Sequence, residues 1–292
     1  MTLNLGPDRV AAAPISWGVC EVPGWGHQMA PSRVLREMAE LGLTATEFGP
    51  DGFLPDAPAD KAATLAAHGM TAVGGFVPVI LHDPSHDPLP GVRTALEGFT
   101  AAGAGTLVLA AATGLDGYNT RPELDESGWK TLLANLDRLA DLAASVGITG
   151  SLHPHVGTMI EGPGEVDRVL EGSGIGLCLD TGHLLIGGTD PVALARRAAD
   201  RVVHVHLKDV DPDAAAEVRA GRATYTGAVA DGMYRPLGQG GVDLPALVGA
   251  LESAGYGGWY VMEQDAVLSA EPDADGGPVA DVRASLAWLS AL

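Results

Sequence analysis

The chain has 292 residues, 46% of them hydrophobic and 18% charged, and its 37 acidic against 17 basic residues give a formal net charge of −20. This composition is that of one globular domain spanning residues 1–292, and the negative field repels phosphate, which excludes duplex nucleic acid as a partner. Because the sequence has no apolar run of about 18 residues and no basic leader after Met1, we expect no membrane contact and a cytoplasmic location.

Short β-rich runs alternate with amphipathic stretches rich in Ala and Leu along the whole chain. Strands are predicted over residues 11–17, 44–49, 71–77, 106–111, 148–153, 175–180, 202–206 and 259–263. Helices are predicted over residues 31–42, 59–69, 91–103, 126–146, 163–171, 191–199, 243–254 and 279–290. Most of these helices end at a glycine, the residue that favours the left-handed C-cap: Gly42, Gly69, Gly103, Gly147 and Gly255.

Eight strand–helix repeats predict parallel pairing with right-handed crossovers. A closed (β/α)8 barrel of the TIM type accommodates eight such units without leaving a free sheet edge. The competing layout is an open doubly wound sheet. No G-x-G-x-x-G motif follows the first strand, which disfavours a dinucleotide-binding version of that sheet.

One connection, residues 208–242 after the seventh strand, is unusually long. Long insertions in compact domains are commonly lids or binding loops, and the glycines around Gln239 favour a segment that moves. We expect Gln239 to reach the substrate when this loop closes; a disordered insertion is the alternative. The two cysteines, Cys20 and Cys178, have no metal or redox spacing and are expected to be ordinary core or pocket residues.

Polar residues gather where the last four predicted strands end, which is the catalytic end of a barrel of this type. His153, Asp180, His206 and Glu263 each take such a position. Taken singly, each has a simpler interpretation: a hydrogen-bonded core histidine, a capping aspartate or a salt-bridged glutamate. Together, two imidazoles and two carboxylates at one level of the barrel predict a divalent metal site, because buried charges need partners.

The chain resembles the sugar phosphate isomerase/epimerase superfamily of barrels, which includes xylose isomerase, and within it the inosose dehydratase family. The segments that carry the resemblance appear in the same order in both and run from about residue 11 to 265: Ala13-Pro-Ile-Ser-Trp17, Thr46-Glu-Phe-Gly49, His153-Pro-His-Val-Gly-Thr158, Cys178-Leu-Asp-Thr-Gly-His183, His204-Val-His-Leu-Lys-Asp209 and Gly258-Trp-Tyr-Val-Met-Glu-Gln-Asp265.

The resemblance implies a metal held by Glu, Asp, His and Glu. The last three fall on Asp180, His206 and Glu263, whereas the first falls on His153, a departure from the usual glutamate. This departure resembles the dehydratase branch, and His155 or a water is the alternative ligand there. The resemblance also implies Mn2+ or Co2+ as the metal, which suits imidazole-rich ligation better than Mg2+ does.

From these residues we expect a hydro-lyase that dehydrates a cyclic polyol ketone, an inosose. An α-proton leaves, a metal-stabilised enolate forms and the β-hydroxyl is eliminated. The candidates for acid and base are Glu263, His155, His183, Lys208 and Glu47, and those for substrate contact are Trp17, His183, Gln239 and His82.

Three other functions stay open from the sequence. A keto-sugar isomerase or epimerase uses the same metal–enolate chemistry but conserves mass. A nuclease for damaged DNA shares the fold, but the net charge of −20 argues against it. A non-catalytic sugar-binding barrel is the third, and a homo-oligomer is compatible with each of them.

Overall fold

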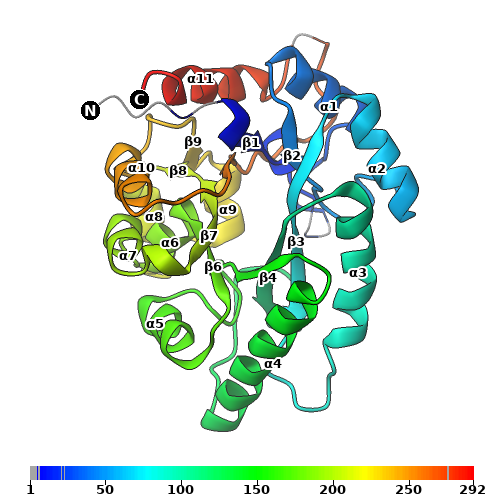
Figure 1. The fold of residues 1–292 in the computed structure, drawn as a ribbon. Helices are drawn as coiled ribbons and strands as arrows, with labels where there is room; N and C mark the ends of the chain where they lie inside the picture. Colours follow the sequence, from blue (N-terminus) through cyan, green and yellow to red (C-terminus); the bar gives the residue numbers. More distant parts are fainter. Residues whose placement is uncertain (1–4, 6, 21, 23, 275) are drawn as a thin grey trace.

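The computed structural model describes residues 5, 7–20, 22, 24–274 and 276–292, and within these ranges eight parallel strands close into a barrel (Figure 1). Neighbouring strands around the barrel follow one another in the chain, and the first closes the ring between the last and the second. The strands are β1 (Val10–Ala12), β2 (Ala45–Glu47), β3 (Thr71–Ile80), β4 (Thr106–Ala112), β5 (Thr149–Leu152), β6 (Gly176–Asp180), β7 (Val202–Leu207) and β10 (Tyr260–Met262). The predicted (β/α)8 barrel is therefore confirmed. Residues 1–4 and 6, where we expected no leader, lie outside the described residues.

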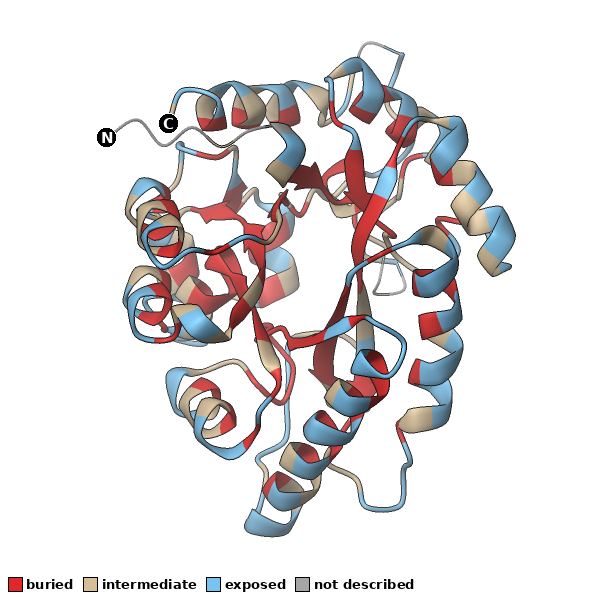
Figure 2. Ribbon diagram, in the orientation of Figure 1, coloured by how far each residue is buried: buried red, intermediate tan, exposed pale blue. Residues whose placement is uncertain are grey.

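Helices surround the barrel and bury their apolar faces against its strands, as the colouring of Figure 2 shows. The helices that follow the barrel strands are α1 (Pro31–Glu40), α2 (Pro58–Ala67), α3 (Leu89–Ala102), α4 (Glu126–Ala144), α5 (Pro163–Gly172), α7 (Pro191–Arg197), α10 (Leu244–Ser253) and α11 (Val279–Leu289). Many of them have proline in the first turn, where its missing N–H costs nothing. All the predicted helices are present, and the five glycines expected at their C-terminal ends have positive φ.

The first strand is shorter than predicted. It ends at Ala12, and Pro14–Trp17 form a 3-10 turn. Proline fixes φ and lacks the N–H that a strand would donate, so the chain turns away at Pro14. As a result Trp17 leaves the barrel and is fully buried against α1, where its Nε1–H donates to Glu37 Oε2 (2.7 Å).

The segment expected to be a loop, residues 208–242, is folded. It contains α8 (Pro212–Arg219), α9 (Tyr225–Ala230) and an antiparallel ribbon of β8 (Asp209–Val210) with β9 (Tyr234–Arg235). These elements share a small hydrophobic core with α6 (Thr181–Gly187), through Ile186. Asp209 is buried and accepts backbone N–H bonds from Gly238, Gly240 and Val242 at 2.9–3.0 Å. This part of the chain is therefore folded and held by specific bonds, in contrast to the expected irregular loop, and its closure over a substrate stays a prediction.

Among the described residues, none of the helices combines the length and apolar character that crossing a bilayer requires.

Candidate metal and substrate site

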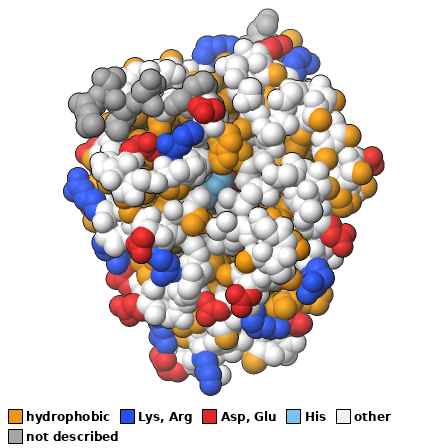
Figure 3. Space-filling model, in the orientation of Figure 1, with side chains coloured by type: hydrophobic (Ala, Val, Ile, Leu, Met, Phe, Trp, Pro, Cys, Tyr) orange, Lys and Arg blue, Asp and Glu red, His pale blue; other side chains and the backbone are white. Residues whose placement is uncertain are grey.

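A cavity of about 310 Å³ opens at the carboxyl ends of the barrel strands. In Figure 3, histidine atoms are visible near the middle of the face shown, surrounded by hydrophobic and uncharged side chains. The polar part of the cavity wall is formed by Glu47, His153, His155, His206, Lys208, Glu263 and Asp265. The structure thus brings most of the predicted acid, base and ligand residues to one place.

Three of the four predicted metal ligands lie close enough to share one ion. His206 Nδ1 is 3.6 Å from Asp180 Oδ2 and 3.3 Å from Glu263 Oε2, and the three ligand atoms all lie within 4.8 Å of one another. Metal–ligand bonds of about 2.1 Å place neighbouring ligand atoms about 3.0–3.4 Å apart. Strand register explains the arrangement, because Asp180 pairs with His206 on adjacent strands and Glu263 N donates to the Leu207 carbonyl (3.0 Å).

His153 lies beside this group. Its Nε2 is 3.1 Å from Asp180 Oδ2, and its Nδ1 has no hydrogen-bond partner among the described residues. A neutral imidazole has one donor and one acceptor nitrogen. The position therefore allows His153 to be the fourth ligand if Nδ1 carries the proton. Its role as a ligand stays a prediction.

Asp180 combines two roles that we had treated as alternatives. Its Oδ1 caps α6 by accepting from the His183 N–H (2.8 Å), while Oδ2 faces His153 and His206. Burial alone would raise the pKa of Asp180, but the positive charge of Lys208 and the neighbouring imidazoles hold it well below its usual range. The residue is therefore ionised, as a metal ligand must be.

Glu47 reaches across the barrel from β2 and binds two histidines of β7. Its Oε1 accepts from His204 Nε2 (2.7 Å) and from His206 Nε2 (3.0 Å). Because Nε2 of His206 carries this proton, the lone pair of neutral His206 lies on Nδ1, the nitrogen that faces Asp180 and Glu263. Gly74 leaves the space, since a side chain there would meet Glu47 Oε1 at 3.3 Å.

This arrangement corrects the expectation that Glu47 faces the substrate as a free acid or base. Glu47 lines the cavity, but its Oε1 is committed to the two imidazoles, which lower its pKa against the opposing effect of burial. A carboxylate behind a ligating imidazole orients that ligand and fixes its tautomer. Glu47 therefore lies where it can orient His206, and its part in the reaction stays a prediction.

Lys208 is a fully buried ammonium with three acceptors. Nζ donates to Asp265 Oδ1 (2.7 Å), lies 3.1 Å from Glu263 Oε2 and 3.2 Å from His183 Nε2. Burial would lower the pKa of Lys208, but Asp265, Glu263 and Asp180 raise it well above the ordinary value. Lys208 is thus a fixed positive charge, and the expectation that it acts as a base is not supported by its surroundings.

The electrostatic balance of the site favours an added cation. Among the described residues of the site, Asp180, Glu263 and Asp265 lie around the ammonium of Lys208, and a fourth buried carboxyl group, that of Glu47, lies against His204 and His206. Buried charges that lack partners are strongly unfavourable. Burial opposes the protonation of His206, but Cys178, Glu263 and Glu47 raise its pKa well above the ordinary value. A divalent ion held by Asp180, Glu263 and His206 Nδ1 would remove the need for that proton.

His155 bonds the backbone, in contrast to His153, His204 and His206, which face carboxylates. Its Nδ1 donates to the Val156 carbonyl (2.7 Å), so Nε2 carries the lone pair. Burial, with the neighbouring charge of His153 and Lys208, lowers the pKa of His155 well below its usual value. His183 stacks behind it with ring centroids 3.7 Å apart and does not line the cavity. His155 is therefore a neutral imidazole available to accept a proton.

Besides His183, three residues predicted to touch the substrate do not line the cavity: Trp17, Gln239 and His82. Trp17 is buried in the helix layer, for the reason given above. Gln239 is exposed in a turn whose flanking glycines are bound by Asp209. His82 begins a turn in which Asp83 accepts from the backbone and the hydroxyl of Ser85.

Aromatic residues on three distant segments form the outer wall of the cavity. The rings of Trp25, Tyr118 and Tyr225 lie with centroids 6.1–6.2 Å apart. Hydrogen bonds join the same segments, since Trp25 Nε1 donates to the Thr226 carbonyl (3.3 Å) and Asn119 Nδ2 donates to Thr226 Oγ1 (3.0 Å). Loop aromatics carry no periodic signal, so sequence reasoning missed them.

Asp265 was also missed, although a signal was available. It follows Glu263 by two residues, and residues two apart in extended chain share a face. The structure places Asp265 on the cavity wall, where its Oδ2 accepts from the Tyr225 hydroxyl (3.1 Å) and its Oδ1 accepts from Lys208. His204 could have been found in the same way, from its position two residues before His206.

Comparison with known proteins agrees with this geometry. Residues 35–292 match the family of xylose isomerase-like TIM barrels. An inosose dehydratase from Geobacillus kaustophilus is 34% identical over 278 residues, covering 91% of this chain and 90% of that protein. The rhizopine catabolism protein MocC of Rhizobium meliloti is 33% identical over 266 residues, covering 88% and 81%. Among solved structures, the IOLI protein with a bound zinc atom has a TM-score of 0.67 at 14% identity, covering 97% of this chain and 98% of that one. The chain therefore belongs to the xylose isomerase-like TIM barrel family and is an enzyme related to the inosose dehydratases.

Proposed function

We propose that the chain is a metal-dependent hydro-lyase that removes water from a cyclic polyol ketone of the inosose class. The observation that carries the proposal is the convergence of Asp180, His206 and Glu263, with ligand atoms within 4.8 Å of one another. His206 and Glu263 line a cavity large enough for one sugar ring, and Asp180 lies buried beside them. The names of the relatives support the same reaction, since several are inosose dehydratases.

The donor set suits a divalent ion of intermediate hardness. Two carboxylate oxygens and one or two imidazole nitrogens favour Mn2+ or Co2+ over Mg2+. Such an ion, when bound by Asp180, His206 and Glu263, would supply Lewis-acid polarisation of a carbonyl oxygen. The remaining chemistry is assigned to the side chains around it.

His155 is the best candidate for moving the proton. Its free Nε2 accepts the α-proton of the bound ketone, and the electron pair of that C–H bond becomes the new C=C bond as the C–O bond to the β-hydroxyl breaks. The imidazolium then returns the proton to the departing hydroxyl, which leaves as water. No net proton is gained or lost by the protein. Lys208 stays charged throughout and stabilises negative charge that develops nearby.

The walls of the cavity suit a ring with both polar and apolar edges. Trp25 and Tyr118 offer aromatic faces for the C–H edges of a polyol ring, and Asp265 and Lys208 offer groups for its hydroxyls. An epimerase needs a second proton-transfer group on the opposite face. Glu47 is a candidate acid or base that also lines the cavity, but it is bonded to His204 and His206. Dehydration therefore fits better than epimerisation.

The decisive experiment follows product mass. The purified chain, stripped of metal, is incubated with scyllo-inosose in D2O with and without Mn2+, beside a Glu263→Gln variant. Loss of one water with Mn2+ only, absent in the variant, supports the proposal. Deuterium incorporation without loss of water makes the chain an isomerase or epimerase. Tight Mn2+ binding with neither change makes it a sugar-binding barrel. A cytoplasmic location and homo-oligomer formation stay predictions.

A further inference from the structure

A buried thiol lies directly beneath the proposed metal site, and the chemistry above does not use it. Cys178 precedes Asp180 by two residues on β6, so both side chains point into the barrel, with Cys178 one layer deeper. It pairs in register with His204, as Asp180 does with His206. Cys178 is fully buried and is not among the residues that line the cavity.

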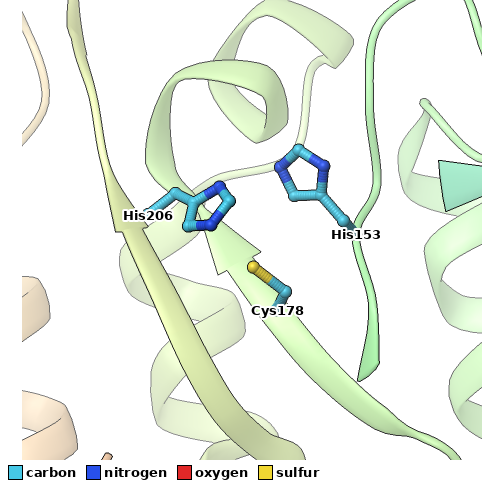
Figure 4. A group of neighbouring side chains, drawn as sticks. All are labelled: His153, Cys178 and His206. Carbon is cyan, nitrogen blue, oxygen red and sulfur yellow. The ribbon is translucent and has the colours of Figure 1, made fainter. Parts of the chain in front are cut away.

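The sulfur of Cys178 lies between two imidazoles. Figure 4 shows the thiol below and between the rings of His153 and His206. His153 directly follows β5, and His206 lies in β7. The sulfur and one nitrogen of each ring lie within 4.8 Å of one another. Both histidines are almost completely buried, and the Nδ1 atom of each has no hydrogen-bond partner within the described part of the chain.

This donor set differs in kind from the one on the cavity wall. A thiolate with two imidazoles is the ligand set of soft or borderline ions such as Zn2+ and Cd2+, whereas carboxylate oxygens suit Mn2+. We propose that His153, Cys178 and His206 form a second, deeper ion position that takes thiophilic divalent ions. The thiol proton is released to solvent as the sulfur–metal bond forms.

The two positions exclude each other because they share one lone pair. His206 donates its Nε2 proton to Glu47, so only Nδ1 can bind an ion, and it binds one ion at a time. An ion on Cys178 lies below the cavity wall and withdraws His206 from Asp180 and Glu263. Thiophilic ions therefore inhibit the enzyme, because an ion bound at the deeper position beside Cys178 keeps His206 from the ion at Asp180 and Glu263. The inference needs the metal site but does not depend on the identity of the substrate.

The chain has two cysteines, which makes a clean test possible. In the Cys20→Ser variant, Cys178 is the only thiol, so any ultraviolet thiolate-to-cadmium absorption must come from it. We expect Cys20→Ser to develop this absorption with one equivalent of Cd2+ and the double variant Cys20→Ser/Cys178→Ser to lose it. A second double variant with Cys178→Ala, checked by circular dichroism, guards against misfolding of the serine form.

Competition with Mn2+ tests the shared ligand. Electron paramagnetic resonance of the Mn2+-loaded Cys20→Ser protein should show one Mn2+ released for each Cd2+ bound, and the Cys178→Ser form should resist release. Glu263→Gln in the same background should weaken Mn2+ binding while the cadmium absorption persists. Absence of the absorption in Cys20→Ser, its persistence without Cys178, or binding of both ions together would each overturn the inference. None of these readouts requires turnover, so a wrong substrate assignment leaves them unaffected.

Discussion

Replacing Glu47 by glutamine tests whether this residue positions His206 or reacts with the substrate. The carboxylate accepts two imidazole N–H bonds, at 2.7 Å from His204 and 3.0 Å from His206. A hydrogen bond to a charged acceptor contributes about 1.5–3 kcal/mol, against about 0.5–1.5 kcal/mol for a neutral pair. Two weakened bonds therefore cost about 2 kcal/mol.

If Glu47 fixes the tautomer of His206, this free energy is lost from the binding of the metal. Since about 1.4 kcal/mol corresponds to a factor of ten, Glu47→Gln should weaken Mn2+ binding roughly 30-fold. This lies within the roughly 10–100-fold range for groups behind a metal ligand. Isothermal titration calorimetry of the metal-free protein measures the Kd directly. Glu40→Gln, at an exposed position on α1, is the matched control and should bind Mn2+ like the unmodified chain.

The result that refutes this reasoning is also specific. If Glu47→Gln binds Mn2+ with unchanged affinity but loses kcat at saturating metal, then Glu47 takes part in the reaction itself. If turnover recovers when Mn2+ is raised above the new Kd, Glu47 acts through His206 as described.

Three further changes probe the other assignments. Glu263→Gln removes a carboxylate that faces His206 Nδ1 at 3.3 Å. The Mn2+ content of the dialysed protein, measured by elemental analysis, should therefore fall to background. Retention of one equivalent of Mn2+ would show that Glu263 is not a ligand. His155→Gln should lower kcat roughly 10²–10⁴-fold, the range for loss of a general base, with Mn2+ Kd unchanged, and a normal kcat would assign the proton transfer elsewhere. Trp17→Phe deletes the buried hydrogen bond to Glu37 and should lower the free energy of unfolding by about 1–3 kcal/mol in urea titrations. The KM should stay constant because Trp17 lies outside the cavity. A raised KM would show that Trp17 contacts the substrate after all.

Sequence reasoning succeeded where one geometric rule decides position. Parallel strands of a barrel present their carboxyl ends at one level, so Asp180, His206 and Glu263 were predictable as neighbours from their places at three strand ends. It failed where position depends on distance across the barrel. The bond from Glu47 to His206 spans from β2 to β7 and needs the gap left by Gly74, which no local pattern reveals.

Two of the predictions that the structure corrects have separate physical causes. Trp17 was counted as the end of a strand, but Pro14 stops the strand and rotates the indole into the helix layer. Residues 208–242 were read as a loop because their helices are short and their glycines numerous. Their order comes from one buried carboxylate, Asp209, whose three backbone bonds to residues 238–242 are invisible in the sequence.

The cavity is divided between the two halves of the chain in an unequal way. The second half contributes only side chains that titrate, whereas the first half contributes mainly apolar and aromatic ones. All the candidate ligands therefore lie within the span from His153 to Glu263, and the shape of the opposite wall is set by residues before Asn119. Substitutions in the amino-terminal loops would therefore reshape the space for a ring-shaped substrate while leaving the candidate ion ligands in place.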